Sequence, residues 1–254
     1  MRLLALDTST RLACVASADL GSARAAERCL EVSAHSEKLL LLVDECLREL
    51  GLLPADLDGV ICGSGPGSFT GLRIGLSTAK GLCYALGRPL VMVSSLLALA
   101  HSVAGLREAP AILSTMDAFR GRVFARLVVR SEAALPETLR ALLTESPQLL
   151  SDGLWRPEEL SALLRRAATP LVACGSGVLR YPELLPSDSE HLSGLLAPQP
   201  QILVRLGAEL LSRGETTALA AAVPNYLAVS AAEENRAPAP ASFDEKSPSV
   251  PSGV

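Results

Sequence analysis

The stretch DGVICGSGPGSFTGLRIG, residues 58–75, decides the fold. Its apolar first half is typical of a buried strand, and its glycines allow a sharp turn into a helix that we expect over residues 71–86. Ser68 or Thr70 can cap the start of that helix with a side-chain oxygen. A strand, a glycine-rich loop and a helix in this order can hold an anion, because free amides and the positive end of the helix dipole meet at the loop.

The glycine loop matches neither of two common phosphate-binding motifs. A Walker loop needs lysine and then serine or threonine after its last glycine, whereas Leu72 and Arg73 follow Gly71. The dinucleotide-binding fingerprint needs a third glycine where this chain has Ser68. The loop therefore either contacts an anion or simply packs the helix close to the sheet. The candidate residues are Gly65, Pro66, Gly67, Ser68, Thr70, Gly71 and Arg73.

The hydrophobic pattern alternates between strands and helices on both sides of this loop. In the first half it predicts strands at 2–7, 11–18, 23–32, 58–65 and 89–93 and helices at 36–50 and 71–86. In the second half it predicts strands at 111–118, 123–130 and 171–177 and helices at 157–168 and 201–213. Both halves contain a strand that ends on an acid and a strand that enters a GSG loop. We therefore expect two related α/β lobes.

The predicted lobes and tail divide the chain into three parts. We expect the first lobe over residues 1–100 and the second over 101–235. Residues 236–254 are rich in proline, serine and alanine and hold few large apolar side chains. That composition predicts a disordered tail.

Composition restricts the class of protein. The chain has 254 residues, of which 49% are hydrophobic, and a net charge of −4, which argues against a large nucleic-acid surface of its own. Its six cysteines show no CxxC spacing and no histidine at metal-ligand spacing, so we interpret them as small buried residues in a reduced compartment. Its first residues do not predict a signal peptide, and it has no apolar run of the roughly 18 residues that a membrane helix needs. We expect a cytoplasmic protein without a membrane partner.

Four stretches resemble the TsaB family, also called YeaZ, a subunit of the bacterial machinery that makes threonylcarbamoyladenosine in tRNA. They are LLALDTST (3–10), HSEKLL (35–40), GPGSFTGLRIG (65–75) and MDAFRGRVFA (116–125). The resemblance covers residues 1–235 and departs from the family at Ala228, where an arginine is usual. It implies an α/β, actin-like or ribonuclease-H-like fold (the ASKHA class) with two related lobes.

The first strand ends in a degenerate phosphate loop. ATPases of the implied fold carry an acid-X-Gly-Thr/Ser loop there, whereas this chain has Asp7, Thr8, Ser9 and Thr10. The Cβ of Ser9 would hinder close approach of a phosphate to the backbone. Asp7 and Asp117 each end a strand and could act as acid and base, but no nucleophile or metal ligand accompanies them. We therefore predict no catalytic residues in this chain.

The resemblance also implies that this chain holds no metal. The catalytic paralogue, TsaD, binds a metal with two histidines, and Ser95 and Leu99 occupy the matching positions here. A leucine side chain has no donor atom for a metal. His35, His101 and His191 lie far apart and show no HxxxH or HExxH spacing.

The two helices of the first lobe are the predicted partner interface. Helix 71–86 is apolar on nearly all sides, so something besides the sheet must cover it, either the chain itself or a partner. The resemblance implies a helical bundle with the catalytic paralogue, or with a second copy when the paralogue is absent. Gly75 would allow close approach, since a mid-helix glycine costs about 1 kcal/mol relative to alanine. The predicted contact residues are Leu39, Val43, Cys46, Leu72, Gly75, Leu76, Ala79 and Cys83.

The resemblance thus predicts a non-catalytic subunit. It would activate a TsaD-like paralogue that transfers threonylcarbamoyl to an adenosine next to the tRNA anticodon. It implies a TsaE-like ATPase as third partner and tRNA bound through the complex. It implies no cofactor on the subunit alone, while leaving room for ATP or ADP at the shared interface. The alternatives are an ATP-dependent kinase or hydrolase of the actin-like class, or a protease acting on the paralogue.

Overall fold

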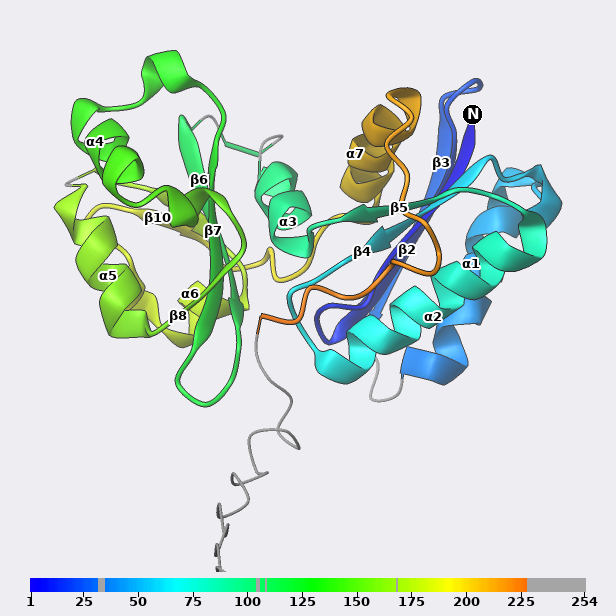
Figure 1. Cartoon of the computed structure of the whole chain (residues 1–254), viewed down its shortest axis with the longest axis horizontal. Coiled ribbons are helices and arrows are strands. Elements are labelled where there is room, and N and C mark those ends of the chain that lie inside the picture. The colour runs from blue at the N-terminus through cyan, green and yellow to red at the C-terminus, as the bar shows by residue number, and fades with distance from the viewer. Residues whose placement is uncertain (32–34, 104–105, 108, 168, 228–254) are drawn as a thin grey trace, which may run out of the picture.

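The computed structural model describes residues 1–31, 35–103, 106–107, 109–167 and 169–227. These residues form two lobes that lie side by side, and each lobe contains one five-stranded sheet (Figure 1).

The first sheet has the strand order β3-β2-β1-β4-β5. Its strands are β1 (Arg2–Asp7), β2 (Leu12–Asp19), β3 (Arg24–Glu31), β4 (Gly59–Gly63) and β5 (Leu90–Val93). Strands β1 to β3 form an antiparallel meander, and β4 and β5 run parallel to β1. Helices α1 (His35–Leu50) and α2 (Phe69–Leu86) cover one face, and α7 (Pro200–Ser212) covers the other. Successive side chains of β1 alternate between the two cores: Leu4 faces α1 and α2, and Leu3 faces α7.

The second sheet has the order β10-β9-β6-β7-β8. Its strands are β6 (Ala111–Asp117), β7 (Val123–Val129), β8 (Gly153–Trp155), β9 (Val172–Cys174) and β10 (Glu190–Leu192). The helices of this lobe are α3 (Ser95–Val103), α4 (Glu137–Glu145), α5 (Pro157–Arg166) and α6 (Ser176–Arg180). Short 3-10 turns lie at Pro54–Asp56, Glu132–Ala134, Pro147–Leu150 and Pro182–Leu184. Helix α3 lies between the two sheets, where Leu96 and Leu99 pack on β6 and β7 (Figure 1).

Both sheets share one topology. If the strands are numbered within each lobe, both read 3-2-1-4-5, with strands 1 to 3 antiparallel and strands 4 and 5 parallel to strand 1. This is the ribonuclease-H-like arrangement, and its duplication is the actin-like fold. The predicted fold class of two related α/β lobes is confirmed.

The predicted division of the chain needs one correction. Helix α7 was assigned to the second lobe, but Leu203 and Val204 pack on Leu3 and Ile61 of the first sheet. Helix α3, which begins before the predicted boundary at residue 100, packs on the second sheet instead. The first lobe therefore consists of residues 1–93 and 200–227. The predicted tail (236–254) and Ala228 lie outside the described residues.

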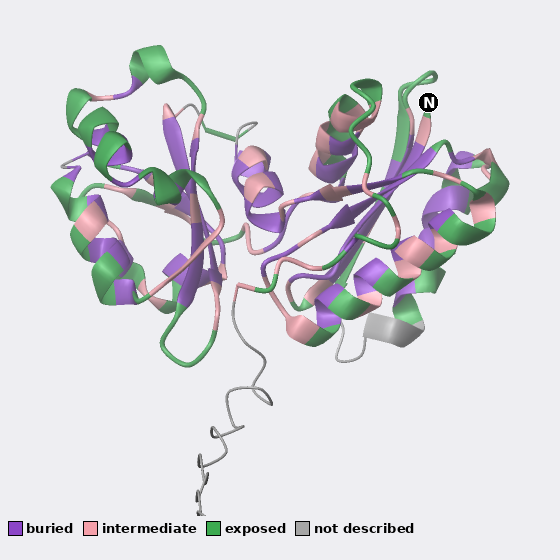
Figure 2. Ribbon diagram, viewed as in Figure 1, coloured by how far each residue is buried: buried purple, intermediate pink, exposed green. Residues whose placement is uncertain are grey.

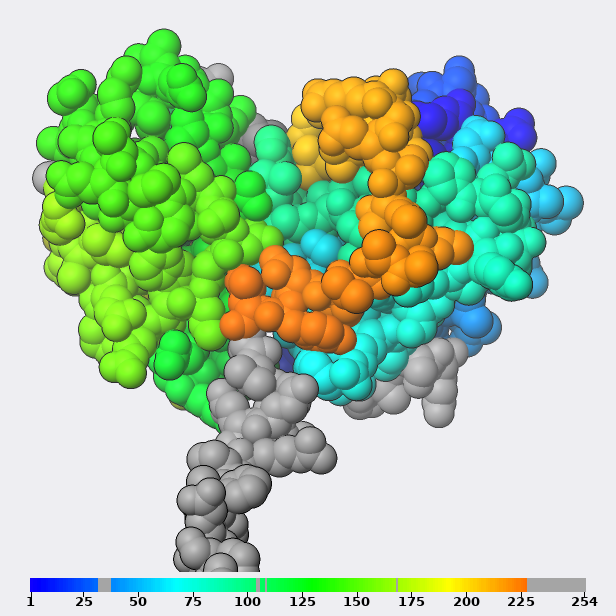
Figure 3. Space-filling model, in the orientation of Figure 1, coloured from blue at the N-terminus to red at the C-terminus, as the bar shows by residue number. Residues whose placement is uncertain are grey.

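After α7 the chain crosses the first lobe as a strap, residues 217–227, which runs over α2 toward the second lobe (Figure 3). Thr217 pairs with Leu90 at the edge of the sheet. The amine of Lys80 donates a hydrogen bond to the Ala222 carbonyl (3.1 Å). The strap covers a flank of α2 that the sheet leaves open, so the chain itself supplies part of the cover that this apolar helix requires.

The strap also links the lobes through Asp152, whose side chain is only 8% exposed. One carboxylate oxygen accepts hydrogen bonds from the Ser94 hydroxyl (2.8 Å) and the Arg126 guanidinium (3.1 Å). The other oxygen accepts one from the amide of Asn225 in the strap (3.0 Å). The Asn225 backbone N–H donates to the carbonyl of Ser64 in the first lobe (2.8 Å). A single carboxylate thus connects both lobes and the strap.

Figure 2 shows that the helices turn their buried sides to the sheets and their exposed sides to solvent. In the described part of the chain, no helix is both long and apolar enough to cross a membrane.

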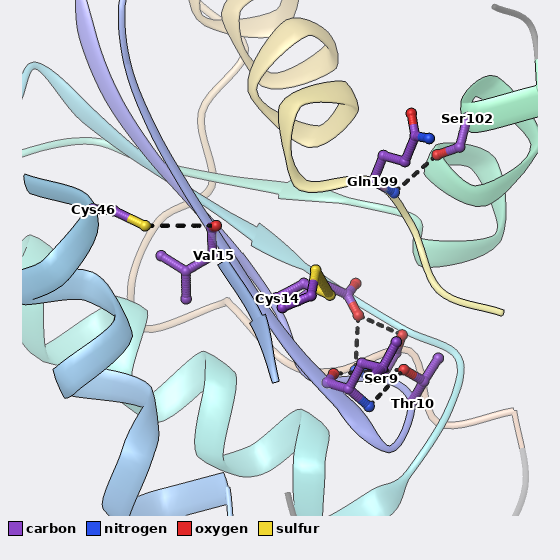
Figure 4. The surroundings of a disulfide bond; sticks show 10 residues. Ser9, Thr10, Cys14, Val15, Cys46, Ser102 and Gln199 are labelled. Atoms are coloured by element: carbon purple, nitrogen blue, oxygen red, sulfur yellow. Dashed lines mark hydrogen bonds between the residues drawn. A yellow bond between two sulfur atoms is a disulfide. The ribbon is translucent and has the colours of Figure 1, made fainter. Parts of the chain in front are cut away.

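Two of the six cysteines depart from the prediction that all are single buried residues. Cys14 of β2 and Cys29 of β3 face each other across the antiparallel ladder, 4.3 Å apart at Cα, and form a disulfide. Cys14 is buried beside the Ser9–Thr10 turn (Figure 4). Cys29 is exposed on the edge strand β3. The prediction failed because the pairing depends on the register of a hairpin, which the spacing of cysteines does not reveal.

The other cysteines are free and buried, as predicted. Burial raises the pKa of Cys46 and Cys83 to about 11 and that of Cys174 to about 12. Burial, and then the charge of Asp7, also raises the pKa of Cys62. Thiols with pKa values this high carry almost no reactive thiolate at neutral pH.

Breaking the Cys14–Cys29 bond should lower stability. Cross-linking residues separated by 15 positions is expected to contribute about 3 kcal/mol by restricting the unfolded chain. For a chain of this size, a Cys29→Ser variant should melt about 6–12 °C lower than the oxidised wild type. Thermal unfolding with and without reductant measures this, and reductant should leave the variant unchanged. Equal melting temperatures for the variant and the oxidised wild type would show that the bond contributes nothing.

Candidate functional site

A cleft of about 970 Å³ opens between the lobes. The first lobe contributes the β1–β2 turn (Ser9–Leu12) and part of the glycine loop (Gly67 and Ser68). The second lobe contributes the β6–β7 turn (Phe119–Gly121) and the end of α6 (Arg180). Because β1 and β4 run parallel, their carboxyl ends meet at this edge, and the degenerate phosphate loop and the glycine loop lie together.

Asp7 lies beneath this cleft and is 1% exposed. One of its carboxylate oxygens accepts hydrogen bonds from the Ser9 backbone N–H (2.9 Å) and hydroxyl (2.5 Å). The other accepts one from the Ser95 hydroxyl (2.5 Å). The carboxylate is therefore held by the chain's own donors. Ser95 is one of these donors, and it occupies the position that we matched in sequence to a metal-binding histidine of the paralogue.

The glycine loop packs directly on the degenerate phosphate loop. A Cβ at Gly67 would overlap the Ser9 carbonyl, and one at Gly71 would overlap the Thr8 carbonyl. The Thr8 hydroxyl donates to the carbonyl of Gly71 (2.7 Å). A Cβ at Gly75, one turn further along α2, would overlap the same hydroxyl. These glycines are needed so that α2 can approach the end of β1 closely.

The amides of the glycine loop are largely used inside the chain. Those of Ser64 and Ser68 donate to the carbonyls of Val93 and Ser9, at 2.8 and 2.7 Å. That of Gly65 donates to the Ser95 hydroxyl (3.1 Å). The loop's Gly65–Pro66 peptide is cis. Amide donors that already have partners are not available to a ligand. The hydrogen bonds of this loop therefore favour a role in packing α2 against the sheet over a role in binding an anion.

Helix α2 begins at Phe69, two residues before the expected start. Of the two predicted caps, Ser68 is the one that acts: its hydroxyl accepts a hydrogen bond from the Gly71 N–H (3.2 Å). Thr70 is exposed in the first turn.

Arg73 points away from the glycine loop. Its guanidinium lies over the Phe69 ring, 3.9 Å from the ring centre, and donates to the Tyr226 hydroxyl (3.0 Å). The rings of Phe69 and Tyr226 are 5.0 Å apart. Arg73 therefore ties the strap to the start of α2.

The two strand-end acids do not share the cleft. Asp117 lines it and accepts a hydrogen bond from the Phe119 N–H (2.9 Å), whereas Asp7 is sealed beneath the loops. Leu99 is fully buried in the core. Within the described ranges, no three His, Cys, Asp or Glu side chains gather in a way that could hold a metal.

The histidines lie on separate elements, His101 on α3 and His191 on β10. Nδ1 of His101 lies 3.4 Å from the Arg205 guanidinium. Burial, and then the Arg205 charge, lowers the pKa of His101, and burial lowers that of His191. In the part of the chain that the structure describes, neither histidine hydrogen-bonds to a serine, threonine or cysteine, the contact that a nucleophile and base would need. The side chain of His35 lies outside the described residues.

The eight predicted interface residues all lie in the interior of the first lobe and need correction. They are Leu39, Val43, Cys46, Leu72, Gly75, Leu76, Ala79 and Cys83. They form the sides of α1 and α2 that face the sheet, so they are covered before any partner arrives. The helical periodicity identified the apolar sides correctly, but it could not tell whether a sheet or a partner covers them.

The sequence reasoning missed the charged groups at the cleft. Arg11, Arg120 and Arg180 all line it, and they come from two turns and a helix end that lie far apart in sequence. No local pattern joins them; Arg120 alone lies in a quoted stretch, MDAFRGRVFA.

Comparisons with known proteins agree with this architecture. Residues 31–146 match the family model of TsaD, tRNA N6-adenosine threonylcarbamoyltransferase. The tRNA threonylcarbamoyladenosine biosynthesis protein TsaB of Escherichia coli K12 is 28% identical over 89% of this chain and 94% of its own. The TsaB of Haemophilus influenzae is 35% identical over 52% of this chain and 56% of its own.

A solved structure extends the likeness to three dimensions. The structure of YeaZ from Pseudomonas aeruginosa superposes with a TM-score of 0.71 at 29% identity and covers 89% of this chain and 99% of that one. The motifs quoted above, the duplicated lobes and these relatives agree: the chain is similar in sequence and in fold to the TsaB family, also called YeaZ.

Proposed function

We propose that this chain is a non-catalytic binding subunit of the machinery that makes threonylcarbamoyladenosine in tRNA. The observation that carries the proposal is the closed phosphate loop: Ser9 bonds to Asp7, and the glycine loop fills the space above it. An ATPase of this fold would need that space and those amides for phosphate. The pathway in this proposal comes from the names of the relatives, which are called tRNA threonylcarbamoyladenosine biosynthesis proteins.

The proposed partner is a TsaD-like paralogue, and the proposed surface is the outer stripe of α2. Most of its exposed residues recur at helical spacing: Thr70, Arg73, Ser77, Gly81 and Tyr84, with Ala85 next to the last of them. Tyr84 is 84% exposed, and a Cβ added to Gly81 would meet nothing within 4 Å. A large exposed tyrosine beside small residues is typical of an interface anchor with room for a neighbouring helix.

The neighbouring helix α1 extends this surface with two apolar side chains. Leu40 and Leu41 are 56% and 59% exposed, although a helix in a monomer normally turns leucines inward. In the absence of the paralogue the same surface would pair two copies of this chain. A TsaE-like ATPase, tRNA bound through the complex, and ATP or ADP at the shared interface complete the proposed assembly.

Gly81→Leu and Tyr84→Ala should each weaken binding of a TsaD-like protein from the same organism. Leucine would fill the space that a partner helix needs, at a cost of about 1–3 kcal/mol. That corresponds to roughly 5- to 150-fold in the dissociation constant. Titration of labelled partner by fluorescence anisotropy measures the change, and sedimentation measures self-association.

Ala141→Leu provides the matched control, because it also adds an exposed leucine to a helix but lies on α4 of the second lobe. It should bind normally. If both α2 variants bind as tightly as this control, the interface lies elsewhere. Turnover of ATP or cleavage of the paralogue by the pure chain, lost on substitution of Asp7 or Asp117, would favour the kinase, hydrolase or protease alternatives instead.

A further inference from the structure

The interlobe cleft has positive charge on both of its sides, in a chain with a net charge of −4. Arg11 comes from the β1–β2 turn of the first lobe. Arg120 comes from the β6–β7 turn and Arg180 from the end of α6, both in the second lobe. Three elements from two lobes therefore bring guanidinium groups to one hollow.

Two of these charges are not neutralised by the chain. No described residue forms an ion pair or a hydrogen bond with the side chain of Arg11 or Arg180; Arg180 only approaches the Tyr181 ring, at 6.0 Å. Arginines elsewhere on the surface are commonly paired, as Arg28 is with Glu49 and Arg107 with Glu190. Glu31 and Asp117 also line the cleft. Unneutralised arginines that converge on a cavity are typical of a site for phosphate.

The β6–β7 turn presents an aromatic ring beside these charges. Phe119 is 61% exposed, and both Phe119 (φ 60°) and Arg120 (φ 49°) adopt the left-handed conformation that glycine or asparagine normally occupies. Residues held in this conformation cluster at functional sites, where the surrounding structure enforces it. The β6–β7 turn thus places both Phe119 and Arg120 at the cleft.

We propose that the cleft binds a single-stranded segment of RNA, with phosphates on Arg11 and Arg180 and a base stacked on Phe119. Exposed aromatic rings between arginines suit a nucleic-acid strand, because every base offers a flat face. An acidic peptide would use the arginines but not the ring. A free nucleoside triphosphate would need the amides of the glycine loop, and those of Ser64, Gly65 and Ser68 already donate within the chain. The identity of the RNA as the tRNA to be modified rests on the function proposed above.

The test uses the full-length chain and fluorescently labelled RNA, an anticodon stem-loop and an unstructured uridine oligonucleotide, in anisotropy titrations across a salt series. Each phosphate contact on a single strand contributes about 0.7 to the slope of log K against log salt, or roughly fivefold in affinity at 0.1 M salt. Arg11→Gln and Arg180→Gln should each weaken binding about fivefold and the double variant about 25-fold, with the slope reduced accordingly. Phe119→Ala should weaken binding about tenfold, and Phe119→Tyr should retain it.

Arg213→Gln provides the charge-matched control, since Arg213 is exposed at the end of α7, far from the cleft in sequence and not among its lining residues. It should change binding by less than twofold. The proposal is overturned if the control weakens binding as much as the cleft variants do. It is equally overturned if ATP, inorganic phosphate or a polyglutamate peptide binds with the same arginine dependence while RNA does not.

The partner titration on the same preparations separates this inference from the proposed function. Normal partner binding with RNA binding indifferent to Arg11 and Arg180 overturns the cleft proposal alone. Arginine-dependent RNA binding without partner binding supports the cleft proposal and overturns the proposed docking.

Discussion

A Gly75→Leu variant should lose at least about 3 kcal/mol of its free energy of unfolding, at the upper end of what overpacking costs. A Cβ at Gly75 would overlap the Thr8 hydroxyl, which is buried and bonded to the Gly71 carbonyl. The side chain has nowhere to go, because the end of β1 lies directly beneath α2. The melting temperature should fall by about 6–12 °C. Thermal and urea unfolding followed by circular dichroism would measure the loss.

Gly81→Leu is the matched control on the same helix. A Cβ there meets no atom within 4 Å, so the change should leave stability unchanged or raise it by up to about 1 kcal/mol through helix propensity. The two variants should therefore behave oppositely: Gly75→Leu should unfold early, whereas Gly81→Leu should fold normally and bind its partner poorly. A Gly75→Leu chain as stable as wild type would mean that α2 does not pack on Thr8 as described.

Asp152→Ala should cost about 3 kcal/mol, because it removes the carboxylate that joins both lobes and the strap. Arg126, whose side chain is only 23% exposed, would lose its ion partner, and Ser94 and Asn225 would each lose an acceptor. Removing one partner of a largely buried pair leaves the other charge uncompensated, which is the costly case. Unfolding experiments measure the loss, and hydrogen exchange should show faster opening in residues 217–227 than elsewhere.

The control for Asp152 is Asp44→Ala, which breaks an exposed pair between Asp44 and Arg48 on α1. Exposed pairs contribute about 0–1 kcal/mol, so this variant should resemble wild type. Asp152→Asn should fall between them, because it retains a hydrogen-bond acceptor but not the charge. If Asp152→Ala and Asp44→Ala are equally stable, the carboxylate does not hold the strap.

Much of the fold could be predicted from segments that carried their own pattern, although helix α4 was missed despite the helical spacing of Leu139, Leu142 and Leu143. Helix α1 has a strong apolar periodicity and a closing glycine at Gly51, and the loop before α2 is rich in glycine. Helix α3 was missed because Leu96, Leu99 and their neighbours are buried on nearly every side, so it has no polar face to mark a helical period. Strands β8 and β10, of three residues each, are too short to show any alternation.

The site could be predicted only in part, because some of its residues come together only in the folded chain. The end of β1 and the glycine loop can each be recognised from a short stretch of sequence, and parallel strands bring their ends together at one sheet edge. The roles of Gly75 and Gly81 could not be told apart, since both are mid-helix glycines and only the position of Thr8 separates them. The convergence of Arg11 and Arg180 depends on how two lobes face each other, which no sequence window contains.

The return of α7 to the first lobe has a consequence for synthesis on the ribosome. The face of the first sheet that includes Leu3 and Ile61 stays uncovered until residues 200–212 have emerged, because that helix is its cover. The strap over α2 follows later still. A chain released early by a stalled ribosome would therefore lack both the cover and the strap. The docking through α2 proposed above would then require a chain translated at least through residue 227, so that shorter products would be excluded from the assembly.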